Sequence, residues 1–348
     1  MRLVTILRVL AAVAVVTSIS LFAPLDSARA WLTPLPKSVE AQVDAATHYG
    51  LDGVIVYWDD PRGVGHTYAA GWFDRDKKIP AKPDALFKIA SISKLYIAAA
   101  TVQLVADGQL ALDASLKSLL PAYSDKIPQS ERITLAMLIQ HRSGIYNFTD
   151  LENYPWDNPP KSNADTLAMI LGMPLVFPPG SETRYSNTNY ILLGEIMDRT
   201  LGYSHHQYIQ QRFLNPLGLK DTYHVLADAD INRVMSGYHV GYDKDIKRND
   251  FVNPGGSMVA TAKDVAVFVR ALNDGSLLSN RAQALYSDLY QFGHTGLVPG
   301  FQSIARYHPA LDAVVVEFVN TSGGNSTLTL GVVYRRIVKI LERQAQRG

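Results

Sequence analysis

The 348-residue chain contains no cysteine. This absence excludes disulfide bonds, a thiol nucleophile and the lipid-attachment cysteine of a bacterial lipoprotein. An excess of either charge is also missing, because 33 basic side chains stand against 32 acidic ones, for a formal net charge of +1 at pH 7. Nothing in this charge balance suggests binding to nucleic acid or to an anionic membrane, so we expect neither as a partner.

Metal-ligand patterns are scarce as well. The nine histidines include no His-x-x-x-His pair and no pairing with a carboxylate at ligand spacing. His205 and His206 are neighbours on an expected helix, so we expect their side chains to point apart at the surface. The sequence therefore predicts neither a metal site nor another cofactor.

Long hydrophobic runs are confined to the N-terminus. Arg2 and Arg8 form a basic region, the apolar stretch 9–22 is too short to span a bilayer comfortably, and a small-x-small pattern ends at Ala30. We interpret residues 1–30 as a secretory signal peptide, with an uncleaved N-terminal anchor as the alternative. Cleavage after Ala30 would remove three arginines and one aspartate, leaving 30 basic and 31 acidic side chains in a periplasmic or secreted protein.

The most informative feature of the remaining chain is the pair Ser91 and Lys94. Residues at i and i+3 lie on one face of a helix, so an alcohol and an amine at this spacing can share a hydrogen bond. A hydroxyl nucleophile and a base are the smallest set of groups that a serine nucleophile without a histidine partner needs. A lysine in the first turn also opposes the helix dipole, which argues against a purely structural role.

Two further motifs follow Ser-x-x-Lys in order. Tyr185-Ser186-Asn187 precedes a helical run, and His294-Thr295-Gly296 precedes two expected strands. Each tripeptide alone is weak evidence for a catalytic site. The three motifs in this order, each at a junction of secondary structure, are much more specific evidence.

With these motifs the chain resembles the serine β-lactamase and penicillin-binding-protein superfamily, most closely its branch of class C β-lactamases, D-alanyl-D-alanine carboxypeptidases and esterases. The segments ITLAMLIQHRSGI, FPPGSETRYSNTNYILLGEIM and GHTGLVPGFQSIARYHP also resemble that branch. The similarity extends from about residue 51 to the C-terminal helix.

The resemblance implies roles for the motif residues. Ser91 would attack a carbonyl carbon and form an acyl-enzyme, while Lys94 and Tyr185 would share the proton transfers, with the general base left open between them. The substrate-binding residues would be Asn187, His294, Thr295 and Gly296. The backbone N–H groups of Ser91 and Leu297 would form the oxyanion hole.

Two departures from the family pattern bear on the substrate. His294 replaces the lysine typical of β-lactamases, and Leu297 replaces a hydroxyl residue that many carboxylate-binding members carry. Arg306 on the neighbouring strand is the residue that could compensate for the missing hydroxyl, but strand alternation is expected to turn it to solvent. We expect an exported serine hydrolase that acts as a monomer on D-amino-acid peptides, including cell-wall-derived ones, or on carboxylic esters. β-Lactamase activity and a catalytically silent penicillin-binding or sensor protein are the alternatives.

Three other residues or pairs near the motifs are expected to be structural. Ser93 has no lysine three residues later, His141 is expected to be a loop residue hydrogen-bonded to backbone, and Gly255-Gly256 should serve a tight turn near the cleft.

The resemblance implies an α+β fold of the β-lactamase/transpeptidase type, and the patterns along the chain agree with it. Residues 31–93 and 275–348 should form an antiparallel sheet covered by terminal helices, and residues 94–274 an inserted, mainly helical region, in one catalytic domain over 31–348. Apolar residues make one stripe on the last helix: Leu330, Val333, Ile337, Ile340 and Leu341. The other helices are expected at 38–48, 92–107, 163–172, 187–200, 204–214 and 261–273.

Overall fold

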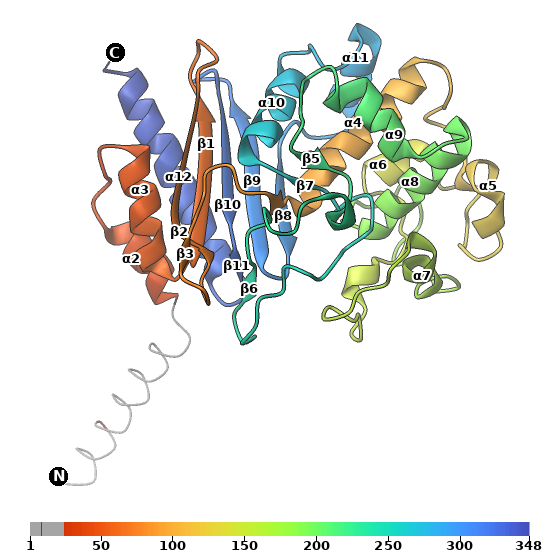
Figure 1. The fold of residues 1–348 in the computed structure, drawn as a ribbon. Coiled ribbons are helices and arrows are strands. Elements are labelled where there is room, and N and C mark those ends of the chain that lie inside the picture. Colours follow the sequence, from red (N-terminus) through yellow and green to blue (C-terminus); the bar gives the residue numbers. More distant parts are fainter. Residues whose placement is uncertain (1–7, 9–23, 348) are drawn as a thin grey trace.

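The computed structural model describes residue 8 and residues 24–347, and a six-stranded antiparallel sheet lies at its centre (Figure 1). The strand order is β3-β2-β1-β10-β9-β8. The strands are β1 (Gly53–Asp59), β2 (Gly65–Asp74), β3 (Ile79–Pro80), β8 (His294–Val298), β9 (Phe301–His308) and β10 (Ala313–Val319). Because β1 pairs with β10, the two ends of the chain build one sheet, as the sequence predicted.

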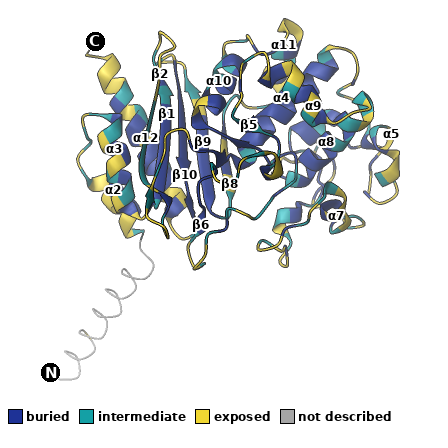
Figure 2. Ribbon diagram, viewed as in Figure 1, coloured by how far each residue is buried: buried dark blue, intermediate teal, exposed yellow. Residues whose placement is uncertain are grey.

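Helices from both termini cover one face of this sheet. They are α2 (Leu25–Leu32), α3 (Val39–Ala46) and α12 (Ser326–Ala345). The predicted stripe on α12 packs inward, with Leu330, Val333, Ile337 and Ile340 buried and Leu341 partly buried against the same cluster. Figure 2 shows these helices dark on the side facing the sheet and yellow on the side facing solvent.

The other face of the sheet carries the helical region. Its helices are α4 (Ser93–Ala106), α5 (Leu116–Leu119), α6 (Leu135–Ile139), α7 (Asn163–Ala168), α8 (Asn187–Leu201), α9 (His205–Ile209), α10 (Ala262–Asn273) and α11 (Asn280–Leu289), with a π-helical turn at Gln210–Leu214. Helix α4 is buried over nearly its whole length, so it forms the axis of this region. Since β10 is covered on both faces, all of its residues are buried, which explains its continuous apolar run.

The observed architecture confirms the α+β fold class and corrects some boundaries. Helix α7 ends at Ala168 rather than at residue 172, where Gly172 adopts a left-handed φ of 86° and closes the segment. Helix α11 lies within residues 275–348, which the sequence assigned to the sheet and its terminal helices. Two small sheets also lie in or beside the helical region; they comprise β4 (Phe87–Lys88), β5 (Thr222–Tyr223) and β7 (Val259–Ala260), and β6 (Tyr238–His239) with β11 (Thr321–Ser322).

Most of the predicted signal peptide lies outside the described residues, but its last part forms α2. The Ser27 hydroxyl hydrogen-bonds the Thr329 hydroxyl at 2.8 Å, and Ala30 is fully buried among the side chains of the terminal helices. Cleavage after Ala30 stays a prediction, with the consequence that it would remove most of this helix. In the described part of the chain, no helix is both long and apolar enough to cross a membrane.

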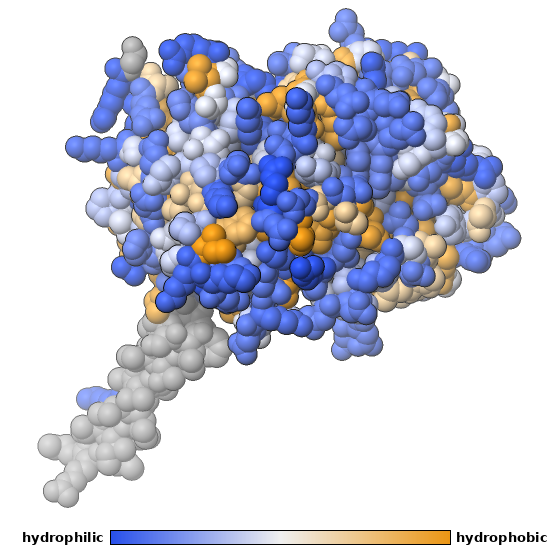
Figure 3. All heavy atoms as spheres, viewed as in Figure 1, coloured by the Kyte–Doolittle hydropathy of each residue, from blue (hydrophilic) through white to orange (hydrophobic). Residues whose placement is uncertain are grey.

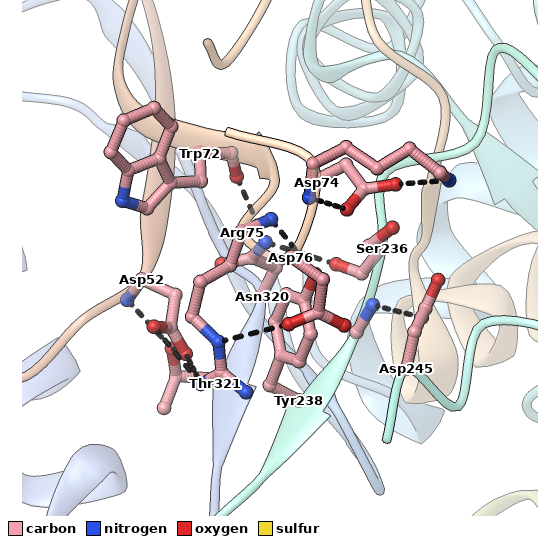
Figure 4. A network of polar contacts seen from close by, with 12 residues as sticks. Asp52, Trp72, Asp74, Arg75, Asp76, Ser236, Tyr238, Asp245, Asn320 and Thr321 are labelled. Atoms are coloured by element: carbon pink, nitrogen blue, oxygen red, sulfur yellow. Dashed lines mark hydrogen bonds and ion pairs between the residues drawn. The ribbon is translucent and has the colours of Figure 1, made fainter. Parts of the chain in front are cut away.

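A polar network fastens the segment around β6 to the main sheet (Figure 4). The Asn320 side chain donates to the carbonyl oxygens of Trp72 and Ser236 at 3.1 and 2.9 Å. The Tyr238 hydroxyl accepts the backbone N–H of Arg75 at 2.8 Å, and that guanidinium lies 3.9 Å from the Tyr238 ring centroid. This network holds one end of the pocket described below in place.

Candidate active site

Ser91 lies on a tight 3-10 turn, Ala90–Ile92, which leads directly into α4. The residue before it, Ala90, has a φ of 50°, in the left-handed region that a residue with a Cβ seldom adopts. Such a conformation costs about 1–3 kcal/mol and persists only where the surrounding contacts enforce it. The turn therefore holds Ser91 in a fixed orientation at the N-terminal end of α4.

Lys94 is fully buried beneath Ser91 and is held by three contacts. Its Nζ lies 3.1 Å from Ser91 Oγ, 2.8 Å from Asn187 Oδ1 and 2.7 Å from the carbonyl oxygen of Gly255. A Cβ on Gly255 would lie 2.8 Å from the Tyr190 Cβ and 3.0 Å from Lys94 Nζ, so the close approach requires glycine. The predicted tight turn at this glycine pair thus also supplies a backbone acceptor to the lysine.

Burial sets the charge state of Lys94. Desolvation holds the pKa of its amine well below the usual range, and no carboxylate pairs with it among the described residues. A neutral amine has two N–H donors and one lone pair. Asn187 Oδ1 and the Gly255 carbonyl can only accept, so they take the two donors and leave the lone pair for the Ser91 hydroxyl.

Tyr185 also contacts Ser91, and its ring centroid lies 5.0 Å from Lys94 Nζ. Its hydroxyl donates to Ser91 Oγ at 2.7 Å, although 41% of the residue as a whole is exposed. Burial of the hydroxyl end raises the pKa of Tyr185 to about 12, an effect that the hydrogen bond to Ser91 partly offsets. Tyr185 is therefore a neutral donor at physiological pH, and the His141 ring supports it with a centroid separation of 4.5 Å.

Asn187 begins α8 and is fixed by a second set of polar side chains. Its Nδ2 donates to Asn147 Oδ1 at 3.3 Å and to Thr149 Oγ1 at 3.1 Å. Its backbone N–H also donates to Asn147 Oδ1, at 2.9 Å. These bonds fix which end of the Asn187 amide faces Lys94, since the donor end is already engaged.

Strand β8 brings the His294-Thr295-Gly296 tripeptide against the Ser91 turn. A Cβ on Gly296 would lie 2.3 Å from the Ile89 carbonyl oxygen and 3.1 Å from the Ala90 Cβ. Glycine at this position therefore lets the strand and the turn approach. The next residue, Leu297, has a side chain that is 57% exposed and lines the same pocket as Ser91.

His294 does not reproduce the charge of the lysine that it replaces. Its Nδ1 lies beside the Thr295 carbonyl oxygen, which can only accept, so Nδ1 carries the proton and Nε2 accepts from the Tyr290 hydroxyl at 3.0 Å. Burial, followed by the nearby Lys94, lowers the pKa of His294 to about 4. The ring is therefore neutral at pH 7.

These residues open into a pocket of about 640 Å³. Figure 3 shows hydrophobic surface along the junction between the sheet side and the helical side of the molecule. The pocket is lined by Ser91, Phe148, Thr149, Tyr154, Trp156, Tyr185, Asn187, His239, Tyr242, Phe251, Asn253, Gly256, His294, Thr295, Leu297, Val298, Pro299, Ser322, Gly323 and Thr327. None of these described lining residues is an aspartate, glutamate, lysine or arginine, so no side chain with a permanent charge faces a ligand there.

The residues expected to be structural mostly occupy structural positions. The buried Ser93 hydroxyl donates to the Ala90 carbonyl at 2.6 Å, and His141 Nδ1 accepts the backbone N–H of Ser186 at 3.2 Å. Arg306 is exposed and borders a separate depression, as strand alternation indicated.

The expectation for His205 and His206 was wrong. His205 is buried and its ring centroid lies 4.3 Å from that of His206, because Asp198 Oδ1 binds His205 Nδ1 at 2.7 Å and turns the ring inward. Within residues 24–347, no group of three or more histidine, aspartate or glutamate side chains is arranged to hold a metal ion.

The structure thus brings together all the predicted site residues: Ser91, Lys94, Tyr185, Asn187, His294, Thr295, Gly296 and Leu297. Sequence reasoning missed the acceptor role of Gly255, the supports Asn147 and Tyr290, and the aromatic lining. No local pattern marks Gly255 or Asn147, since each contacts a partner that only folding brings near, whereas Tyr290 lies four residues before His294 and could have been considered from that spacing.

Comparisons with known proteins agree with this geometry. The model of the Beta-lactamase family matches residues 38–291. Protein flp of Staphylococcus aureus (strain MW2) is 34% identical over 153 residues, which are 44% of this chain and 30% of that protein. Esterase EstB of Burkholderia gladioli is 28% identical over 201 residues, 52% of this chain and 49% of that protein. The chain thus spans less than half the length of these relatives.

A solved structure of D-amino acid amidase from Ochrobactrum anthropi SV3 superimposes with a TM-score of 0.78. It covers 88% of this chain and 98% of the amidase at 22% sequence identity, which shows a shared fold. Because the family model spans more than half of the chain and includes the Ser91 and Tyr185 motifs, the chain belongs to the Beta-lactamase family, a family of serine hydrolases.

Proposed function

We propose that the protein is a serine hydrolase that cleaves uncharged carboxylic esters through an acyl-enzyme on Ser91. The observation that carries this proposal is the position of Ser91 Oγ, between Lys94 Nζ at 3.1 Å and Tyr185 hydroxyl at 2.7 Å, in a pocket without a permanently charged side chain among its described lining residues. A general base and a hydroxyl donor within hydrogen-bond distance of a nucleophile are the parts that acyl transfer needs.

In the first step Ser91 Oγ attacks the ester carbonyl carbon while its proton passes to the neutral amine of Lys94. The backbone N–H groups of Ser91 and Leu297 are proposed to stabilise the resulting oxyanion, and each such donor contributes about 3–4 kcal/mol where it is preorganised. Collapse of the tetrahedral intermediate breaks the bond to the alcohol oxygen. That oxygen takes a proton from Tyr185, and Lys94 restores the Tyr185 proton.

In the second step a water molecule hydrolyses the acyl-enzyme, and the protonated Lys94 returns the proton to Ser91. Lys94 accepts the proton of the attacking water, the bond to Ser91 Oγ breaks, and Ser91 regains its proton. The net reaction consumes one water and yields one carboxylic acid and one alcohol, so Lys94 and Tyr185 finish in their starting states.

The uncharged pocket favours esters over the other substrates considered. A carboxypeptidase substrate presents a free carboxylate, which favours a cationic partner in the site. His294 is neutral, Arg306 lies outside the pocket and Leu297 offers no hydroxyl. D-Amino-acid peptides with a free carboxylate, and β-lactams, which carry one as well, therefore rank second and third.

Parallel assays test this ranking. Purified protein is given a 4-nitrophenyl ester, a D-alanyl-D-alanine peptide and a penicillin, and the Ser91→Ala variant serves as the control for each. We expect turnover of the ester to dominate and to disappear in Ser91→Ala. Dominant turnover of the D-peptide would replace the ester assignment, and the absence of any Ser91-dependent turnover or acylation would indicate a silent binding protein.

Export is also part of the proposal. A basic N-terminus, an apolar stretch and the small-x-small pattern ending at Ala30 support it. Intact-mass measurement of protein recovered from the periplasm or the medium of an expressing cell tests it, and recovery only in the cytoplasm would contradict it.

A further inference from the structure

One side of the pocket is a continuous aromatic wall, which consists of Phe148, Tyr154, Trp156 and Phe251. Consecutive ring centroids along it are separated by 5.2, 4.8 and 6.0 Å, so each ring contacts the next. Two chain segments about 100 residues apart build this surface. The proposed reaction does not use it.

The wall is held rigidly from behind. Phe148, Tyr154 and Phe251 are buried, and Asn249 Nδ2 donates to the Trp156 carbonyl oxygen at 3.2 Å. The buried Lys88 donates in turn to the Asn249 carbonyl oxygen at 2.6 Å. This chain of contacts ties the two segments together, so the wall is preformed rather than assembled by a ligand.

The wall adjoins the catalytic network on the side of Asn187. Phe148 lies between Asn147 and Thr149, the two residues whose side chains bind Asn187. A substrate whose carbonyl carbon stands at Ser91 therefore has the wall within reach of the group attached to that carbon.

Asn253 adds a single polar group to this surface. It lines the pocket, and its Oδ1 is buried and has no hydrogen-bond partner among the described residues. Apolar pockets commonly orient their ligands through a few such polar groups, because a buried amide is stable when its hydrogen bonds are made.

We infer that the aromatic wall and Asn253 form the acyl-group subsite, which selects uncharged acyl groups that combine an aromatic ring with a hydrogen-bonding amide. This inference rests on the proposed function and names its substrate class. The ring stacks against the wall, and Asn253 pairs with the amide.

The first test varies the acyl group and keeps the leaving group constant. The 4-nitrophenyl esters of acetic acid, 3-phenylpropanoic acid and N-acetylphenylalanine are compared. For each ester, kcat/KM is divided by the rate constant for its hydrolysis by hydroxide, which corrects for differences in intrinsic reactivity. We expect the phenylpropanoyl ester to exceed the acetyl ester by about tenfold or more, the order that apolar pockets provide. Trp156→Ala should remove most of this preference.

Trp72→Ala is the matched control, because Trp72 is partly exposed on β2 and does not line the pocket. It should leave the preference unchanged. A second series keeps acetate as the acyl group and enlarges the alcohol with aromatic rings. If Trp156→Ala reduces preference in that series instead, the wall accepts the leaving group and the inference is wrong.

Asn253 is tested by the amide-bearing ester. Asn253→Ala should lower kcat/KM for the N-acetylphenylalanyl ester by about three- to tenfold relative to the phenylpropanoyl ester, since a site built for a polar group loses discrimination without it. Equal effects on both esters would overturn the role of Asn253. A flat acyl series with intact Ser91-dependent hydrolysis would overturn the subsite while leaving the proposed function standing, whereas loss of all ester turnover would contradict the function itself.

Discussion

At the residue scale, burial decides which groups of the site carry protons. The Lys94 amine contacts hydrogen-bond acceptors but no carboxylate among the described residues. Desolvation therefore favours its neutral form. The same effect keeps the Tyr185 hydroxyl protonated, with a pKa of about 12. These protonation states support the proposed roles of Lys94 as the base and Tyr185 as the donor, an assignment that the sequence alone left open.

The first prediction concerns substitution of these two residues. Lys94→Ala and Tyr185→Phe should each lower kcat/KM for a 4-nitrophenyl ester by about 10²-fold or more, because general acid–base catalysis contributes that much. The double variant should lose much less than the product of the two factors, since the residues act on one proton path. Near-normal turnover in either single variant would exclude that residue from the mechanism.

The second prediction concerns pH. The base must be unprotonated, so kcat/KM should rise as pH increases through the depressed pKa of Lys94 and reach a plateau before pH 10. The donor must be protonated, so activity should fall only as pH approaches the Tyr185 pKa of about 12. A rising limb centred near the ordinary lysine pKa would contradict a neutral Lys94.

The third prediction turns on Leu297. Matched substrates with a free carboxylate and with its methyl ester should differ little in kcat/KM, because the described pocket lining offers no cation and no hydroxyl at this position. Leu297→Thr should raise the relative rate for the carboxylate about tenfold, which is the lower range for a hydrogen bond to a charged group. A strong preference for the carboxylate in the wild type, unchanged in Leu297→Thr, would favour a carboxypeptidase.

The motif residues could be predicted because each motif places its reactive side chains at a short, characteristic spacing or at the start of a helix. Ser91 and Lys94 are one helical turn apart, and Tyr185 precedes a helix whose periodicity is plain. The roles of Gly255 and Asn147 could not be predicted, because each contacts a residue far away in the sequence and neither stands in a recognisable pattern. Tyr290 lies four residues before its partner His294, but this spacing alone does not distinguish a support from a packing residue.

At the element scale, amphipathic periodicity was sufficient for the long helices. It located α8 and α10 within one residue at each end, and it identified the buried stripe of α12, since each of these helices has one apolar face. The short elements were less predictable. Strands β4, β5 and β7 have two residues each, too few to show alternation, and their pairing depends on distant segments.

Helix α2 gives a fourth prediction. A chain beginning at residue 31 loses the burial of Ala30 and the hydrogen bond from Ser27 to Thr329, together about 1–2 kcal/mol of unfolding free energy. It should therefore melt about 2–3 °C below a chain beginning at residue 24, which keeps both contacts. Equal melting temperatures would show that α2 contributes nothing to stability and that cleavage after Ala30 has no structural cost.

At the scale of the whole molecule, the site exists because three distant parts of the chain meet. The sheet formed by the two chain ends supplies β8, the 3-10 turn Ala90–Ile92 and the buried α4 that follows it supply Ser91 and Lys94, and the start of α8 with the residues just before it supplies Tyr185 and Asn187. Gly296 allows β8 to approach the Ser91 turn closely. Ligand pockets commonly form at such junctions.

Trapping the acyl-enzyme tests this account most directly. The wild-type protein and Ser91→Ala are incubated with a fluorophosphonate probe, digested and mapped by peptide mass spectrometry, with Ser93→Ala as the neighbouring-serine control. We predict one adduct on Ser91 in the wild type and in Ser93→Ala, and none in Ser91→Ala. An adduct on Ser93, or full labelling of Ser91→Ala, would contradict the central claim that Ser91 is the nucleophile.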